Sequence, residues 1–279
     1  SAAFFFCNAI DDSLMGVTDV LRGEDHLTNT PRQILILEAL ALAVPRYAHI
    51  SLILGDDGAP LSKRNGSRSI RELREAGYFP AAITNMLARL GLSYESDACL
   101  DIAGLKAGFA LDRLSKSPAR FDFTHLDHWQ HKAIRSADNA ALWDWLSPEC
   151  RASVPAAKQQ AFIDVVRGNC VFPQQADEWA RIFFTDQTAP QPEATAVLQE
   201  AGTGFVRVLL EAATVCGDDF DAFMQQVKSS TDRKGKALFM PLRAALTGRL
   251  DGPEMGPTYR MLDAERRLKR LAELSETPL

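Results

Sequence analysis

Residues 17–40 read VTDVLRGEDHLTNTPRQILILEAL, and they indicate the order of secondary structure in the N-terminal part of the chain. Its first five residues, VTDVL, are mostly β-branched or apolar and predict a short buried strand. Thr30 and Pro31 then fit the cap and the first position of a helix whose apolar run continues to Pro45. Because apolar residues occupy most faces of this helix, it is predicted to be buried.

The segments on either side extend the pattern. Residues 4–10, FFFCNAI, predict another short buried strand before the turn-forming DDS at 11–13, and HISLIL at 49–54 predicts a strand after the helix. Strand, helix and strand in this order indicate part of an α/β layer with a parallel sheet.

Helical signals dominate from residue 69 onward. Ser69 and Glu72 have the spacing of a capping box, and Gly77 is a plausible stop for that helix. Pro80 begins a second helix that Gly91 ends. Past about residue 135 only helices are predicted, at 138–146, 156–167, 174–184, 193–213, 219–228, 236–247 and 256–274. The expected fold class is therefore mostly α, with a partial α/β region first.

Composition sets broad limits on the chain. Its 279 residues and 46% apolar content suit two or three domains, and the net charge of −5 argues against a wholly basic nucleic-acid coat. Five cysteines without a CxxC fit reduced thiols in a cytosol, and no apolar run approaches the ~20 residues that span a bilayer. Because the sequence opens on an apolar run without Met or a basic leader, we expect it to be part of a longer chain.

A basic loop, PLSKRNGS at 60–67, contrasts with this acidic total. Residues 61–77 carry five cations against two glutamates. One interpretation is a solvated helix face. The other is a polyphosphate site in which Lys63 is a point charge, Arg64 is a fork of donors, and backbone N–H groups lie exposed beside Gly66.

The sequence RGEDH at 22–26 falls between a strand end and a helix start, where ligands of α/β sheets collect. Arg22 is suited to clamp a carboxylate, and His26 to donate to a phosphate or a ribose. The alternative is that Asp25 and Thr30 only cap and charge the helix N-terminus.

Two other patterns are weaker. His125, His128 and His131 are spaced by three, so on a helix they do not face one metal ion, and no metal site is predicted. The GTG at 202–204 lacks the third glycine and the preceding strand of a dinucleotide loop, and a helix-boundary turn is predicted there.

Residues 17–40, YAHISLILGDDGAPLSKRNGSRSI at 47–70 and GYFPAAITNMLARLGLS at 77–93 resemble the second half of the catalytic region of glutamyl-tRNA synthetases, class I enzymes of the glutamyl/glutaminyl group. The ordered motifs RGEDH, SKR and GY…P…N…L…LG carry the likeness. LSKSPARFDFTHL at 114–126 and KGKALFMPLRAALTG at 234–248 extend it to the family's domain junction and helical C-terminal domain.

The resemblance implies activation of glutamate by ATP, with Mg²⁺, to an adenylate, followed by transfer to the terminal adenosine of tRNA(Glu). By this likeness Lys63 is the transition-state cation, and Ser62 and Arg64 shape the same loop, which resembles a mobile lid. His26 and Leu61 are the further ATP contacts that the likeness suggests.

The glutamate pocket that the resemblance implies consists of Arg22, Asn8 and the Phe4 position, with Glu24, Asp25 and His26 lining its remaining side. Two residues depart from the family pattern. Phe4 stands where a tyrosine is frequent, and Pro60 stands where the loop usually opens with a lysine. The HIGH-like phosphate motif is absent from this sequence, so this chain by itself is expected not to aminoacylate.

The resemblance implies three domains: residues 1–132 as the second part of the catalytic domain with a stem-contact region, and 133–190 and 191–279 as two helical anticodon-binding subdomains. An all-α module fits glutamyl enzymes, since the glutaminyl enzyme would bring β-barrels. Arg233, Lys234, Lys236 and Arg243 are candidate tRNA contacts, with a solvated face as the alternative for each. A cytoplasmic monomer without membrane contact is the expected state. The rival hypothesis is a non-catalytic helical RNA- or protein-binding module with a remnant α/β cap.

Overall fold

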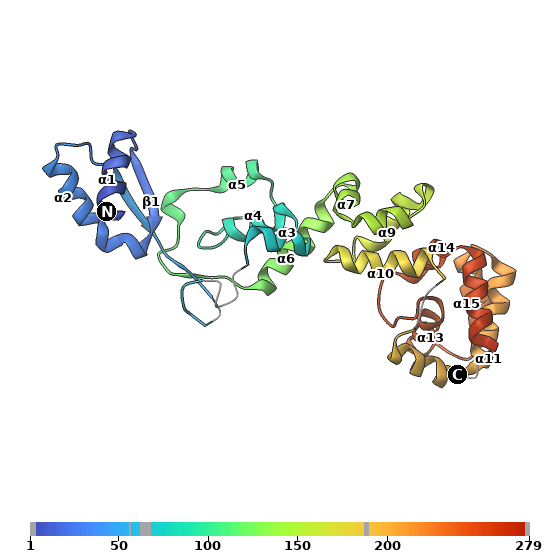
Figure 1. Ribbon diagram of the computed structural model, residues 1–279. Coiled ribbons are helices and arrows are strands. Elements are labelled where there is room, and N and C mark those ends of the chain that lie inside the picture. The colour runs from blue at the N-terminus through green and yellow to red at the C-terminus, as the bar shows by residue number, and fades with distance from the viewer. Residues whose placement is uncertain (1–3, 56, 62–67, 187–189, 277–279) are drawn as a thin grey trace. The chain divides into compact units, whose positions relative to one another are not determined.

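The structure is a computed structural model that describes residues 4–55, 57–61, 68–186 and 190–276 (Figure 1). The chain divides into two compact units, Ser1–Ala133 and Ile134–Leu279. As expected, the fold is mostly α, with short strands confined to the first unit.

The first unit opens with a small parallel α/β arrangement. Its elements are α1 (Phe4–Leu14), β1 (Asp19–Gly23), the 3₁₀ helix η1 (Glu24–Asn29), α2 (Thr30–Ala39) and β2 (Arg46–Ile50). β1 and β2 run parallel, and their register places Arg22 beside His49. Figure 1 shows α1 and α2 beside β1. The predicted strand–helix–strand order with a parallel sheet is therefore confirmed for residues 19–50.

The prediction of a strand at 4–10 is wrong, because these residues form the first two turns of α1. A short apolar run does not distinguish the periodicity of a helix from that of a strand, and its aromatic residues favoured the prediction of a strand. In the folded chain Ala9 is completely buried, and the Phe5 carbonyl accepts a hydrogen bond from the Gln33 side chain of α2. Packing against α2 thus decides the conformation of this segment.

The helix predicted to end at Pro45 is shorter and less buried than expected. It ends at Ala39, and only Thr30, Gln33 and Leu37 are buried, whereas Leu35 is 65% exposed. The apolar outer face has no cover among the described residues. Thr30 is also not the cap: Asn29 precedes the helix without a side-chain cap bond, and the Thr30 hydroxyl has other partners.

The rest of the first unit is a set of short elements. They are β3 (Ile53–Leu54), α3 (Ile70–Ala76), α4 (Pro80–Ala88), α5 (Ile102–Gly108), η3 (Leu111–Arg113), β4 (Ala119–Arg120) and α6 (Phe123–Ser136), which continues into the second unit. HISLIL is divided between β2 and β3, and β3 pairs in parallel with β4.

The sequence predicted both ends of α3 correctly, whereas it predicted the start of α4 but not its end. Ser69 and Glu72 form the predicted capping box, and Gly77 ends α3 with φ +94°, a conformation that favours glycine. Pro80 starts α4 as predicted, but α4 ends at Ala88, three residues before Gly91.

The second unit contains only helices among its described residues. They are α7 (Asn139–Trp145), α8 (Pro148–Ser153), η4 (Ala156–Lys158), α9 (Gln159–Val166), α10 (Pro173–Phe184), α11 (Pro192–Cys216), α12 (Phe220–Ser229), α13 (Lys236–Thr247), α14 (Met255–Met261) and α15 (Ala264–Glu276). α8 was not predicted, and the single helix predicted at 256–274 is two. The predicted GTG turn is a kink inside α11, where Gly202 has φ +78° and ψ 158°.

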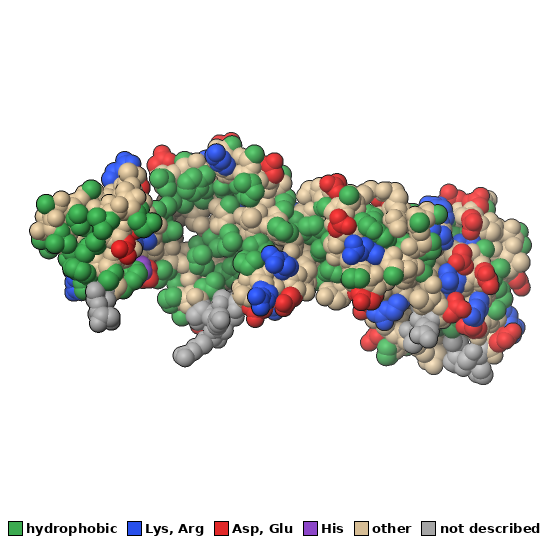
Figure 2. Space-filling view, turned by 45° about the horizontal axis from the view of Figure 1, so that its top comes forward, with side chains coloured by type: hydrophobic (Ala, Val, Ile, Leu, Met, Phe, Trp, Pro, Cys, Tyr) green, Lys and Arg blue, Asp and Glu red, His purple; other side chains and the backbone are tan. Residues whose placement is uncertain are grey.

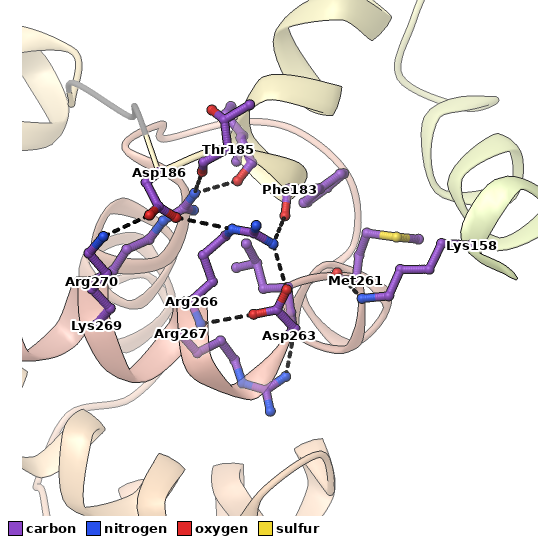
Figure 3. Close-up of polar contacts among 12 residues, drawn as sticks. Lys158, Phe183, Thr185, Asp186, Met261, Asp263, Arg266, Arg267, Lys269 and Arg270 are labelled. Atoms are coloured by element: carbon purple, nitrogen blue, oxygen red, sulfur yellow. Dashed lines mark hydrogen bonds and ion pairs between the residues drawn. The ribbon is translucent and has the colours of Figure 1, made fainter. Parts of the chain in front are cut away.

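A polar network on one face of α15 joins this helix to the rest of the second unit (Figure 3). Arg266 Nε and Lys269 Nζ lie 3.3 and 2.7 Å from the two carboxylate oxygens of Asp186. Arg270 is 7% exposed and donates to the carbonyls of Leu246, Ile182 and Thr185. These carbonyls end α10 and lie near the end of α13, so Arg270 binds helix C-terminal groups that would otherwise lack partners.

The two units differ in how they expose apolar side chains. Only Val215 and Phe239 are large exposed apolar side chains in the described part of the second unit, while the first unit exposes many, including Leu14, Met15 and Leu35.

Candidate active site

Arg22 lies at the carboxyl end of β1, where the strand passes into η1. Its Nη2 donates to the Thr30 hydroxyl at 2.7 Å and to the Gln33 side-chain carbonyl at 2.6 Å. Its guanidinium carbon is 5.0 Å from the centre of the Tyr47 ring on β2. In the described part of the chain, neither Nη1 nor Nε of Arg22 makes a hydrogen bond, and Nε is buried. The cation is therefore held through Nη2, and the donors of Nη1 are left for a ligand, whereas Nε is buried away from one.

Asn8 belongs to the same network through Gln33. The Gln33 amide nitrogen donates to Asn8 Oδ1 at 3.3 Å and to the Phe5 carbonyl at 3.0 Å. Two predicted substrate residues, Arg22 on β1 and Asn8 on α1, thus bind opposite ends of one buried side chain.

β2 supplies the remaining side of the cluster. The Thr30 hydroxyl lies 2.9 Å from His49 Nε2, and the Tyr47 ring packs below Arg22. Burial raises the pKa of Tyr47, with the nearby Arg22 charge acting in the opposite direction. The phenol of Tyr47 is therefore neutral at physiological pH and adds no negative charge beside Arg22.

His26 and Phe4 contact each other at the edge of this cluster. Their ring centres are 5.7 Å apart, and Phe4 is 62% exposed. The Asn29 side-chain nitrogen is 3.2 Å from His26 Nδ1, which assigns the imidazole proton to Nε2 when Asn29 donates. His26 Nε2 is in turn 3.6 Å from Asp25. Asp25 thus contacts His26, while Glu24 accepts a long 3.4 Å hydrogen bond from the Leu52 amide.

The predicted catalytic residues Ser62, Lys63 and Arg64 lie outside the described residues. The chain that leads to them is described: the Leu61 amide donates to the Ile53 carbonyl at 2.8 Å, and Pro60 forms an isolated antiparallel bridge with Leu54. Arg68 follows the segment, with its guanidinium 4.9 Å from the Phe123 ring centre. The residues on both sides of the basic segment therefore make contacts with other parts of the first unit.

The predicted tRNA contacts fall into two groups in the second unit. Arg233 donates to the Ala201 carbonyl at 3.0 Å, and Arg243 to the Pro253 carbonyl at 2.8 Å, so each has an intramolecular partner. Burial lowers the pKa of Arg243. Lys234 and Lys236 are exposed at the start of α13. Figure 2 shows cationic and anionic side chains intermingled over the C-terminal helices on the face in view. The cations on this face therefore do not form a continuous basic surface.

The described part of the chain offers neither a metal cluster nor a membrane-spanning helix. No group of three or more His, Cys, Asp or Glu side chains there could hold a metal ion. Among the described residues, no helix is both long and apolar enough to cross a membrane. All five cysteines are free thiols.

Sequence reasoning missed Gln33, Tyr47 and His49, which complete the Arg22 cluster. A signal for Gln33 was available: it is an amide in the first turn of the predicted helix, directly before the apolar run ILILEAL, and such a residue is costly to bury without partners. For His49 and Tyr47 the signal was only their place on the strand paired with β1, which the sequence does not reveal residue by residue.

Comparison with known proteins relates this geometry to two family models. The catalytic domain of class I tRNA synthetases (E and Q) matches residues 3–128, and an anticodon-binding domain matches residues 124–274. The glutamate–tRNA ligase 1 of Methylococcus capsulatus is 60% identical over 275 residues, which are 99% of this chain and 59% of that protein. The glutamate–tRNA ligase 2 of Nitrosococcus oceani is 52% identical over 271 residues, covering 97% and 57% of the two chains.

A solved structure agrees with the fold. The glutamate tRNA ligase of Elizabethkingia meningosepticum superimposes with a TM-score of 0.83, covering 99% of this chain and 60% of that one, and at 24% identity this likeness shows the fold alone. The chain spans about three fifths of the length of the curated relatives named above. The combination of a synthetase catalytic region with an anticodon-binding domain does not favour a non-catalytic binding module. The chain belongs to the glutamyl-tRNA synthetase family.

Proposed function

We propose that this chain is part of a glutamate–tRNA ligase that activates glutamate with MgATP and transfers it to the 3′ end of tRNA(Glu). In the first step a carboxylate oxygen of glutamate attacks the α-phosphorus of ATP, and pyrophosphate leaves. In the second step a hydroxyl of the terminal adenosine attacks the carbonyl carbon, and AMP leaves. The observation that carries the proposal is the 60% identity to a glutamate–tRNA ligase along 99% of this chain.

Glutamate binding is assigned to Arg22 and Asn8, with Phe4 at the edge of the pocket. The positive charge of Arg22 suits a carboxylate, and the unused donors on Nη1 support this role. Because Arg22 is held by neutral oxygens, its positive charge is not cancelled before an anionic substrate binds.

ATP handling is assigned to Lys63, with Ser62 and Arg64 in the same loop and His26 and Leu61 as further contacts. Attack at the α-phosphorus builds negative charge on phosphate oxygens and on the departing pyrophosphate. A pre-placed ammonium stabilises this charge more strongly in the transition state than in the ground state.

The second unit is assigned to tRNA, with Lys234 and Lys236 on phosphates and Arg233 and Arg243 as additional contacts. Residues 1–132, 133–190 and 191–279 are proposed as the domain divisions. A cytoplasmic monomer is the proposed state of the protein.

The decisive experiment is glutamate-dependent ATP–pyrophosphate exchange in the full-length protein. We expect Lys63→Ala to lower the exchange rate by roughly 10²- to 10⁴-fold, because a charge-stabilising group at the reacting phosphate is removed. Lys106→Ala, which removes an exposed lysine of α5, is the matched control and should leave exchange unchanged.

The outcomes separate the parts of the proposal. Wild-type protein that exchanges with glutamate, together with near-normal Lys63→Ala, would remove Lys63 from its assigned role. Wild-type protein without glutamate-dependent exchange would overturn the ligase proposal itself.

A further inference from the structure

Gln33 is a completely buried glutamine on α2 whose orientation is fixed by its partners. Its carbonyl oxygen faces Arg22 Nη2, which only donates, and its amide nitrogen faces the Phe5 carbonyl, which only accepts. The reverse orientation would place donor against donor and acceptor against acceptor. The two ends of Gln33 are therefore assigned by chemistry as well as by coordinates.

Helix stability does not explain a glutamine at this position. The residues that follow it, Ile34 to Leu37, are apolar, and burying an amide costs free energy that only well-made hydrogen bonds offset. Leucine has a similar volume and would pack the same site without that requirement. The amide is thus accounted for by what it holds.

From this geometry we infer that Gln33 is a positioning residue that sets the orientation of Arg22 for the carboxylate of the substrate. Gln33 and Thr30 together accept both hydrogen bonds from one nitrogen of the guanidinium, and the Tyr47 ring limits its tilt. This fixes the plane of the fork while Nη1 remains without a partner among the described residues. The inference rests on the proposed function.

The same residue links the second predicted substrate contact to the first. Gln33 Nε2 donates to Asn8 Oδ1, so the donor face of the Asn8 amide is left for another acceptor. One side chain on α2 thereby sets the rotamers of residues on α1 and β1. The amide of Gln33 carries no charge, which matters because a carboxylate at position 33 would pair with Arg22 and compete with an anionic substrate.

The test measures KM for glutamate and kcat of pyrophosphate exchange in the full-length protein. Gln33→Leu should raise KM roughly tenfold with kcat changed much less, because it removes a hydrogen bond to a charged group that binds ground and transition states alike. Gln130→Leu is the matched control. Gln130 is equally buried in the first unit, but its amide accepts from the Phe79 backbone N–H and donates to the Gly77 carbonyl. This control should lower stability in urea without raising KM.

A double-mutant cycle distinguishes positioning from a general loss of structure. In an Arg22→Lys background, Gln33→Leu should raise KM less than about threefold, because the fork that it orients is gone. Thr30→Val removes the other acceptor on the same nitrogen and provides a second variant if Gln33→Leu does not fold. It should likewise raise KM only when Arg22 is present.

Equal factors in both backgrounds, or a KM for Gln130→Leu that rises as much as for Gln33→Leu, would overturn the positioning role while leaving the ligase proposal intact. Wild-type protein that neither exchanges pyrophosphate nor binds radiolabelled glutamate would overturn the proposed function and this inference with it.

Discussion

Arg22 in the first unit and Arg267 in the second are both held by several hydrogen bonds and stacked on a tyrosine, yet their surroundings differ. Arg267 is 1% exposed, donates to the carbonyls of Tyr259, Leu262 and Gly217, and pairs with Asp218 at 2.5 Å. Its guanidinium is 4.0 Å from the Tyr259 ring centre. Arg22 is only half-buried, has two neutral side-chain acceptors on one nitrogen, and has no carboxylate partner among the described residues.

The difference separates a structural arginine from one available to a ligand. Three carbonyls and a carboxylate use both outer nitrogens of Arg267, so this side chain closes a helical junction. Arg22 keeps its net charge and part of its fork, which is the arrangement expected for a group that must receive an anion. Three substitutions test this contrast.

The largest effect is expected for Arg267→Met. This change leaves three carbonyls and one carboxylate without their donor, and we expect the free energy of unfolding to fall by about 3 kcal/mol. The Tyr259 hydroxyl would still donate to the Gly217 carbonyl, which limits the loss. Urea unfolding followed by circular dichroism measures it, and KM for glutamate should stay at the wild-type value. A rise in KM without loss of stability would break the contrast.

Arg22→Lys should have the opposite profile. An ammonium keeps the charge but lacks the planar fork, so we expect KM for glutamate to rise roughly 30-fold while urea unfolding changes little. Steady-state pyrophosphate exchange and the same unfolding assay measure the two quantities. If Arg22→Lys destabilises the protein as much as Arg267→Met and leaves KM unchanged, Arg22 is structural as well.

The sequence singled out Arg22 and His26 as candidates from their place between a strand and a helix, because this signal is local, and their role in a site stays a prediction. The Ser69 capping box was predicted from spacing alone and is confirmed. Gln33 was missed because its partners on α1 and β1 lie 25 and 11 residues away along the chain, and no local pattern encodes such contacts.

The error at residues 4–10 has the same origin. Phe4, Phe5 and Phe6 favour a strand by propensity, but packing on α2 selects a helix. The GTG at 202–204 shows the reverse case, since the breaking tendency of Gly202 was read correctly while the helix resumes at once on the far side. Because the helix predicted at 193–213 already ran through this position, local rules gave both the break and the continuation of the helix.

The smallest effect is expected at the exposed ion pairs that Arg266 and Lys269 of α15 form with Asp186. The two cations lower the pKa of Asp186 below the ordinary 3.8, with the Lys269 hydrogen bond as the main cause. A lowered folded pKa means that the charged carboxylate contributes stability above the unfolded pKa. That contribution is lost as the pH falls through the lowered value. Asp186→Asn should therefore be slightly less stable than wild type at pH 7 and equal to it in strong acid.

Thermal unfolding at several pH values measures this difference, with Asp164→Asn as a control at an exposed aspartate whose contact is with a neutral glutamine. Because the charges are exposed, added salt should reduce the effect at pH 7. The same salt should leave the Arg267→Met loss nearly unchanged, since Arg267 lies almost fully out of water. If salt leaves the stability loss of Asp186→Asn unchanged, or reduces that of Arg267→Met, burial does not distinguish the contacts of Asp186 from those of Arg267.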